Sequence, residues 1–190
     1  MPSSDPITIS RVLKLVEKLG PMSILDIGPG NGRYGFLFRE LLDLNYGRFA
    51  RKTWQVVIDG VEVERRYLSP VHDFVYNVVH VANWLSEEVI FQLTYDLAFM
   101  GDILEHFREG EWQKALMKAR RYSKATIVVC PNWRGSISQG PWGGNEFETH
   151  RVELTPAKVG GRCLFANSKC FITAFDNIGS GLLEGKEILP

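Results

Sequence analysis

The sequence of 190 residues lacks an excess of charge, because 22 basic residues balance 22 acidic ones. It therefore offers no long-range attraction to a polyanion such as a nucleic acid. It also lacks an apolar run of about 18 residues, the length that spans a bilayer, and no basic segment precedes an apolar one at its N-terminus. We expect a cytoplasmic protein, with neither nucleic acid nor a membrane indicated as a partner.

Cysteine and repetition are scarce as well. The cysteines are odd in number and lack C-x-x-C spacing, so we expect reduced thiols at Cys130, Cys163 and Cys170. The hydrophobic content of 45% and the charged content of 23% are typical of a soluble globular protein. No internal repeat is visible, and the length suffices for one full core. We therefore predict a single domain over residues 1–190.

Residues 24–32, which read I-L-D-I-G-P-G-N-G, join a short apolar run to Gly28, Gly30 and Gly32. A helical pattern begins at Tyr34, so this stretch is predicted to be a buried strand, a glycine turn and a helix start. The first N–H groups of a helix lack intrahelical partners and can bind a ligand, and glycine lets the backbone approach that ligand closely. Asp26 ends the strand, where it can accept backbone N–H bonds or reach a cationic part of a ligand.

Apolar periodicity predicts alternating strands and helices along the chain. The predicted helices are Thr8–Leu19, one from Tyr34 onward, Tyr67–Tyr76, Glu87–Leu93 after a capping Ser86, one containing Trp112 and Ala119, and a short one opened by Thr155 and Pro156. The predicted strands are Ile24–Ile27, Gln55–Val61, Val78–Ala82, Asp96–Met100, Ala125–Val129 and an antiparallel hairpin of Cys163–Ala166 and Cys170–Phe175. This order predicts an α/β fold with a doubly wound, mostly parallel sheet and helices on both faces. The glycine-rich stretch Asn132–Arg151 is predicted to be a long functional loop.

Ligands of such sheets bind at the carboxyl ends of the strands, where three further polar residues lie. Glu62 ends the second strand, and its carboxylate can accept two hydrogen bonds from a ribose diol. The alternative is that Glu62 is a solvated charge in the charged run 62–66. Asn83 follows the third strand and Asp102 follows the fourth. These positions predict a ligand-binding site at this edge of the sheet.

Residues 24–32 and the Y-D-L-A-F-M-G-D-I-L-E-H-F of residues 95–107 resemble the first and fourth-strand motifs of class I S-adenosylmethionine (SAM)-dependent methyltransferases. The resemblance covers residues 24–131 well, and the N-E-F-E-T-H-R of residues 145–151 more loosely. It implies a seven-stranded sheet with a reversed last hairpin, SAM as the methyl donor and no metal ion. The family often has an acidic residue at the position that Asn83 occupies in this sequence. The side-chain carbonyl oxygen of Asn83 can still accept a hydrogen bond from the adenine amino group. The implied cofactor-binding residues are Asp26, Gly28, Gly30, Gly32, Glu62, Asn83 and Asp102.

Two other functions remain open beside methyl transfer. Gly30, Gly32 and Gly35 match the G-x-G-x-x-G fingerprint of a nicotinamide dinucleotide site. However, nothing after Pro131 is long enough for the substrate domain of a dehydrogenase, and no Tyr-x-x-x-Lys pattern occurs. The other alternative is a protein of this fold that binds SAM or a partner without catalysis. A decayed pseudoenzyme would be expected to lose Gly28, Gly30 or Asp26, and this sequence keeps all three, so we prefer a methyltransferase.

Methyl transfer requires an acceptor aligned with the donor and protected from water. A general base helps a hydroxyl acceptor, whereas an amine does not need one. The candidate catalytic residues are His106, after the fourth strand, and His150, in the long loop, although each could be only a structural hydrogen-bonding group. His72 and His80 fall inside predicted elements and are left out. The expected acceptor is an oxygen or nitrogen atom of a small molecule or glycan.

Overall fold

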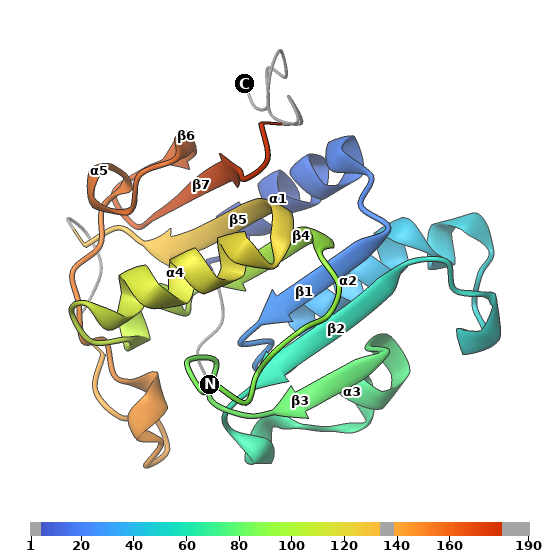
Figure 1. The fold of residues 1–190 in the computed structure, drawn as a ribbon, viewed down its shortest axis with the longest axis horizontal. Coiled ribbons are helices and arrows are strands. Elements are labelled where there is room, and N and C mark those ends of the chain that lie inside the picture. Colours follow the sequence, from blue (N-terminus) through green and yellow to red (C-terminus); the bar gives the residue numbers. More distant parts are fainter. Residues whose placement is uncertain (1–4, 134–138, 180–190) are drawn as a thin grey trace.

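The computed structural model describes residues 5–133 and 139–179. Its centre is a seven-stranded sheet in the order β3-β2-β1-β4-β5-β7-β6 (Figure 1). Strands β1 to β5 pair in parallel, and β7 is antiparallel to both β5 and β6. The predicted fold class and the reversed last hairpin are thus confirmed. The strands are β1 Ser23–Ile27, β2 Val57–Glu62, β3 Val78–Val81, β4 Tyr95–Gly101, β5 Ser123–Pro131, β6 Arg162–Ala166 and β7 Cys170–Asp176.

Helices flank this sheet, and local capping signals fix where they begin. Asp5 caps α1, and Thr155 caps α5 as predicted. The predicted helix 67–76 starts later, because Ser69 caps α3 and the preceding residues form a separate 3₁₀ turn, η3 (Arg65–Tyr67). No helix in the described ranges is long and apolar enough to span a membrane. The α-helices are α1 Pro6–Leu19, α2 Arg33–Leu42, α3 Pro70–Val75, α4 Glu111–Arg121 and α5 Pro156–Val159.

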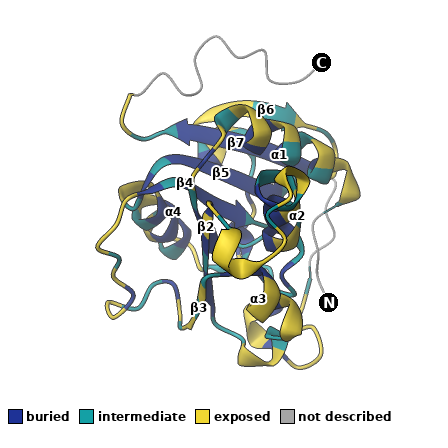
Figure 2. Cartoon of the chain, turned by 90° about the vertical axis from the view of Figure 1, so that its right-hand side faces the viewer, coloured by how far each residue is buried: buried dark blue, intermediate teal, exposed yellow. Residues whose placement is uncertain are grey.

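Both faces of the sheet are covered, which explains why the central strands are almost wholly apolar. Along β4, successive side chains face opposite sides. Leu97 and Phe99 pack with α1 and α2, whereas Ala98 and Met100 pack with α4. Figure 2 shows the central strands as buried and much of the outer helical surface as exposed. The sheet is therefore a well-packed base for whatever its carboxyl edge binds.

The predicted helix Glu87–Leu93 is wrong, because residues 83–94 form turns and irregular backbone. Ser86 does act as a cap would, since its hydroxyl accepts from the Glu88 N–H at 3.3 Å. However, the ammonium group of Lys118 donates to the Ser86 carbonyl at 2.8 Å. The same carbonyl accepts from the Val89 N–H at 3.3 Å, so the backbone forms a turn at this point. Lys118 of α4 thus anchors a turn where the helix was predicted.

The predicted loop 132–151 has more regular structure than its glycine content suggests. Its described part contains a 3₁₀ turn, η5 (Glu146–Glu148), preceded by a β-bridge between Trp142 and Asn145. Residues 134–138 of the loop lie outside the described residues. The part from Trp142 onward therefore has a defined backbone that can position side chains.

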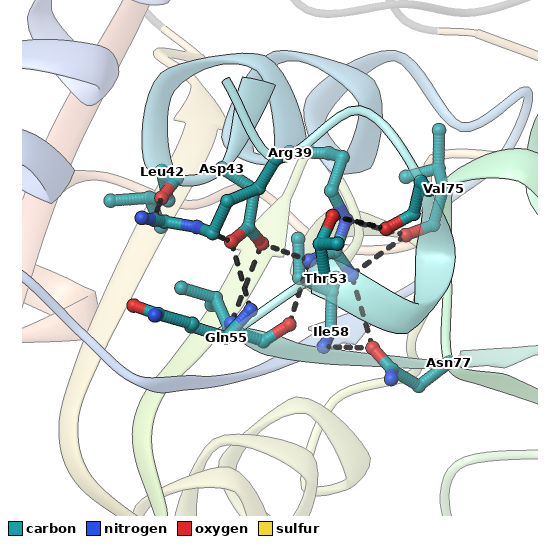
Figure 3. A network of polar contacts seen from close by, with 11 residues as sticks. Arg39, Leu42, Asp43, Thr53, Gln55, Ile58, Val75 and Asn77 are labelled. Atoms are coloured by element: carbon teal, nitrogen blue, oxygen red, sulfur yellow. Dashed lines mark hydrogen bonds and ion pairs between the residues drawn. The ribbon is translucent and has the colours of Figure 1, made fainter. Parts of the chain in front are cut away.

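A buried ion pair connects α2 to α3 and to the segment that leads into β2 (Figure 3). Arg39 and Asp43 are both fully buried, and the guanidinium of Arg39 donates to the Asp43 carboxylate. The same guanidinium donates to the carbonyls of Val56 at 2.7 Å and Val75 at 3.1 Å. Asp43 also accepts from Arg48 at 2.6 Å. This cluster, named here the Arg39 cluster, joins α2, α3 and the start of β2.

Candidate functional site

A cavity of about 450 Å³ lies at the carboxyl ends of β1 to β4, the edge at which parallel sheets bind ligands. Its walls are the glycine turn before α2, the residues that follow β2, β3 and β4, and the segment around η5. Gly32 is not a lining residue, because it faces Val71 of α3. His150 lies beside the cavity, against His106. The other predicted site residues line the cavity together: Asp26, Gly28, Gly30, Glu62, Asn83, Asp102 and His106.

Glu62 holds the glycine turn in place. Its carboxylate accepts from the Gly30 N–H at 2.9 Å and from the Glu64 N–H at 2.8 Å. The residue is 4% exposed, so the alternative of a solvated charge is wrong. Burial raises the pKa of Glu62, and the backbone hydrogen bonds oppose that rise. Because a carboxylate has about four lone-pair sites, Glu62 can still accept hydrogen bonds from a ligand.

Two glycines of the turn have different roles. Gly28 and Gly30 both have positive φ, +75° and +57°. A Cβ at Gly28 would lie 2.4 Å from Cδ1 of Ile103, so this glycine admits the turn that follows β4. No atom lies within 4 Å of the corresponding position at Gly30. Both glycines line the cavity, but only at Gly30 is the direction of a side chain free of protein atoms.

Asp26 faces the cavity but does not hold the turn. It is 2% exposed, and its carboxylate accepts from the Tyr76 hydroxyl at 2.6 Å. Burial raises the pKa of Asp26 to about 7, although the Tyr76 hydrogen bond lowers it and the charge of Glu62 adds to the rise. Gly35 makes room for this contact, since a Cβ there would lie 2.2 Å from the Tyr76 hydroxyl oxygen. A cation in the cavity would favour the ionised form of Asp26.

Asn83 and Asp102 complete the row of polar residues at the strand ends. The side-chain oxygen of Asn83 accepts from the Leu85 N–H at 2.9 Å, which fixes the amide at the cavity wall. Asp102 has a φ of +52°, and no other non-glycine residue in the described ranges has a positive φ. Its N–H donates to the Val129 carbonyl at 2.9 Å, which anchors the unusual backbone. The chain thus turns sharply after β4, as a turn residue such as aspartate permits.

The two predicted catalytic histidines lie together, with a carboxyl group that sequence analysis missed. Glu105 and His106 belong to a 3₁₀ turn, η4 (Leu104–His106), and His150 follows η5. The rings of His106 and His150 are 5.0 Å apart, and Nε2 of His106 lies 3.9 Å from Oε1 of Glu105. Nδ1 of His106 contacts the Thr149 carbonyl at 3.2 Å, so Nδ1 carries the proton of the neutral ring. Burial, and then His150, lower the pKa of His106 to about 4, and burial also lowers the pKa of His150.

A second polar group, absent from the sequence prediction, joins η3 to η5. The Tyr67 hydroxyl donates to the Glu148 carboxylate and accepts from Nδ2 of Asn145 at 3.1 Å. Burial, and then the hydrogen bond to Glu148, raise the pKa of Tyr67 to about 12. All three residues line the cavity. Asn145 and Glu148 fall in the segment 145–151 that loosely resembles the methyltransferase family. That resemblance was the one indication in the sequence that these residues belong to the site.

His72, which the sequence analysis left out, supports the glycine turn. Its Nδ1 accepts from the Ser69 N–H at 3.1 Å, and its Nε2 contacts the Gly30 carbonyl at 3.0 Å. Its ring stacks on Tyr76, with centroids 5.6 Å apart. The signal in the sequence was a capping box, formed by Ser69 and the residue three positions later.

Comparison with known proteins identifies the fold. No family model and no curated protein sequence matches the chain significantly. Solved structures do match. An O-methyltransferase family protein from Burkholderia thailandensis aligns over 88% of this chain and 56% of its own, with 11% identity and a TM-score of 0.56. The chain thus spans little more than half the length of that protein.

Two further solved structures are of proteins in complex with S-adenosylhomocysteine (SAH), the product of SAM. The N-terminal domain of EvdMO1 with SAH bound covers 90% of this chain and 80% of its own, with 16% identity and a TM-score of 0.56. The DhpI–SAH complex covers 89% and 85%, with 13% identity and a TM-score of 0.61. At such low identity the likeness establishes the architecture. The chain has the fold of the class I SAM-dependent methyltransferases.

Proposed function

We propose that this protein is a SAM-dependent methyltransferase. The observation that carries the proposal is the convergence of the Gly30 turn, Glu62 and Asp26 on one cavity at the carboxyl ends of β1 and β2. Proteins with a similar fold have been crystallised with SAH. A strand-end carboxylate beside a glycine turn can bind the hydroxyl groups of a ribose-containing ligand.

The residues of the cavity fit SAM. Glu62 has acceptor sites left for the ribose diol, and the Asn83 amide suits the adenine amino group. Asp26, whose pKa is raised to about 7, would become ionised beside a positively charged part of the ligand. The volume of about 450 Å³ falls within the range of small-molecule sites, roughly 300–1,000 Å³. The glycine at position 35 is needed because the Tyr76 side chain packs against it. Gly35 therefore no longer supports the G-x-G-x-x-G fingerprint of a dinucleotide site.

SAM supplies, when bound, a methyl group already activated by its sulfonium. The residues of the chain then need to align an acceptor with that group and exclude water. His106, Tyr67 and Arg151 line the cavity on the side of η4 and η5, which we assign to the acceptor. With a pKa of about 4, His106 is a weak base at neutral pH and is better suited to positioning the acceptor. The acceptor is an oxygen or nitrogen atom of a small molecule or glycan.

Thermal unfolding tests the cofactor assignment. SAM and SAH should raise the melting temperature, because a ligand at a hundredfold excess over its Kd stabilises the folded state by about 2.7 kcal/mol. NAD and NADP, tested at the same concentration, should leave it unchanged. A shift with NAD and none with SAM or SAH would favour an oxidoreductase instead.

A second experiment tests catalysis. The protein is incubated with isotopically labelled SAM and fractionated cell extract, and mass spectrometry identifies any compound that gains a methyl group. The Glu62→Gln variant serves as the control with a weakened cofactor site. Binding of SAM without any labelled product would favour the non-catalytic alternative.

A further inference from the structure

Glu105, His106 and His150 form a compact group beside the acceptor side of the cavity. One ligand atom from each residue lies within 4.8 Å of the other two. Two contacts hold the contributing segments together: the Glu105 carbonyl accepts from the Arg151 N–H at 2.7 Å, and Nδ1 of the His106 ring contacts the Thr149 carbonyl at 3.2 Å. The group is therefore built by the fold and does not depend on a chance approach of long side chains.

The polar atoms of this group lack the partners that burial normally demands. Glu105 is 2% exposed, and within the described ranges no N–H or O–H group of another residue donates a hydrogen bond to its carboxylate oxygens. The donors near its carboxylate are its own backbone N–H and the buried thiol of Cys130, which is a weak donor. Nδ1 of His150 is also buried without a hydrogen-bond partner among the described residues. A buried carboxylate of this kind calls for a proton or a cation.

We propose that Glu105, His106 and His150 bind a divalent transition-metal ion. Two imidazoles and one carboxylate are the ligands of catalytic zinc sites, which keep a further position open for water or substrate. The Thr149 carbonyl fixes the proton of His106 on Nδ1 and directs Nε2 toward Glu105, as outer hydrogen bonds do in metal sites. Bonds of about 2.0–2.2 Å would require the three ligand atoms to move together by roughly 1 Å or less. The ion would supply the counter-charge that Glu105 lacks.

This site bears on the acceptor, and here the argument rests on the proposed methyltransferase function. His106 belongs to both the metal group and the cavity wall. The acceptor is then a hydroxyl compound whose oxygen binds the ion, because a divalent metal lowers the pKa of a bound hydroxyl group. The hydroxyl proton leaves to solvent, and the oxygen forms a bond to the methyl carbon. The carbon–sulfur bond breaks and its electron pair stays on sulfur, so the products are a methyl ether, SAH and one proton.

Cobalt(II) titration tests the metal site without any acceptor. The full chain, free of a histidine tag and treated with EDTA, is titrated with Co²⁺ and followed by visible absorption, with Zn²⁺ as competitor. The parent protein should bind one Co²⁺ ion, and Zn²⁺ should displace it. Glu105→Gln and His150→Gln should each weaken binding more than about 100-fold, since loss of an outer-shell partner alone costs 10–100-fold.

Two controls keep the outcome interpretable. His80→Gln removes a histidine that is exposed on β3 and should leave Co²⁺ binding unchanged. Circular dichroism establishes that each variant is folded. If the parent does not bind Co²⁺, or if the Glu105 and His150 variants bind it as tightly as the parent, the proposal is wrong. The melting-temperature shift with SAH, measured on the same metal-free samples, tests the methyltransferase assignment independently of this result.

Discussion

Two groups of buried charged residues make the most useful comparison in this molecule. In the Arg39 cluster, the Asp43 carboxylate accepts from Arg39, Arg48 and the Gln55 N–H. Beside the cavity, Glu105 is buried to a similar degree, yet its oxygens have no comparable donors among the described residues. Two carboxyl groups that are buried to a similar degree therefore differ in their hydrogen bonding: Asp43 has strong donors from other residues, and Glu105 does not.

The pKa values of the two carboxyl groups move in opposite directions. For Asp43, burial raises the pKa, but hydrogen bonds from Gln55, Arg48 and Arg39 outweigh it and leave the pKa below its ordinary value. For Glu105, burial and then the charge of Asp102 raise the pKa well above its ordinary value. The Arg39 cluster stabilises the fold, whereas the Glu105 group costs stability until something binds it. A buried carboxyl group with a strongly raised pKa beside a cavity is a candidate functional group.

Removing the guanidinium from the Arg39 cluster should have the largest effect. Arg39→Met would leave the Asp43 carboxylate buried without its main counter-charge, so we expect a loss of about 3–5 kcal/mol in the free energy of unfolding. Urea denaturation measures this loss. Arg48→Met is the matched control, because Arg48 also contacts Asp43 but is 21% exposed, so water can replace it. Equal losses in the two variants would contradict the assignment of Arg39 as the buried centre of the cluster.

Glu62 shares a property with each group. Its carboxylate accepts hydrogen bonds from backbone N–H groups, as Asp43 does, and it lies at the cavity, near the Glu105 group. We expect Glu62→Gln to weaken SAM binding by about 1–3 kcal/mol, since charge-assisted hydrogen bonds to the ribose diol are lost. The unfolding free energy should fall as well, because the amide can replace only one of the two acceptor oxygens that hold Gly30 and Glu64. Isothermal titration with SAH measures the first effect and urea denaturation the second. A change in stability with unchanged SAH affinity would reduce Glu62 to a structural role.

The sheet and its binding edge could be predicted from the sequence, because both depend on local patterns. Apolar runs alternate with helical periodicity, and a parallel sheet necessarily collects the ends of its strands at one edge. Asp26, Glu62 and Asn83 therefore line one cavity although they are far apart in sequence. The glycine turn was visible because strand, glycine and helix signals follow each other directly.

The remaining features depend on contacts between distant residues, which a single sequence does not reveal. Tyr67 meets Glu148 across 81 positions. Lys118 donates to the Ser86 carbonyl across 32 positions and anchors a turn where a helix was predicted. Glu105 was overlooked beside His106 because the sequence gives no indication that it is buried without a donor. Whether a buried carboxyl group has hydrogen-bond donors can be judged only once its neighbours in the fold are known.

The smallest effect that we predict is a change in the pH dependence of stability when Glu105 is replaced, which tests its contrast with Asp43. In metal-free protein, Glu105→Gln should keep or raise stability, because an amide needs no ionisation. Below the ordinary glutamate pKa of 4.5, both the folded and the unfolded parent carry a protonated Glu105, so parent and variant should differ little. As the pH rises above 4.5, the unfolded parent releases this proton while the folded parent retains it, so stability is lost with rising pH. The variant has no such loss.

At about pH 5.5, one unit above that pKa, the variant should therefore gain roughly 1 kcal/mol on the parent relative to pH 4. Urea denaturation at the two pH values, in EDTA, measures the difference, and the titration of His106 and other groups largely cancels between the two proteins. Adding Zn²⁺ should reverse the order, because only the parent keeps the carboxylate ligand. A variant that is less stable than the metal-free parent at both pH values, by the same amount, would mean that Glu105 is already satisfied. The contrast with Asp43 would then disappear, since both carboxyl groups would serve the fold alone.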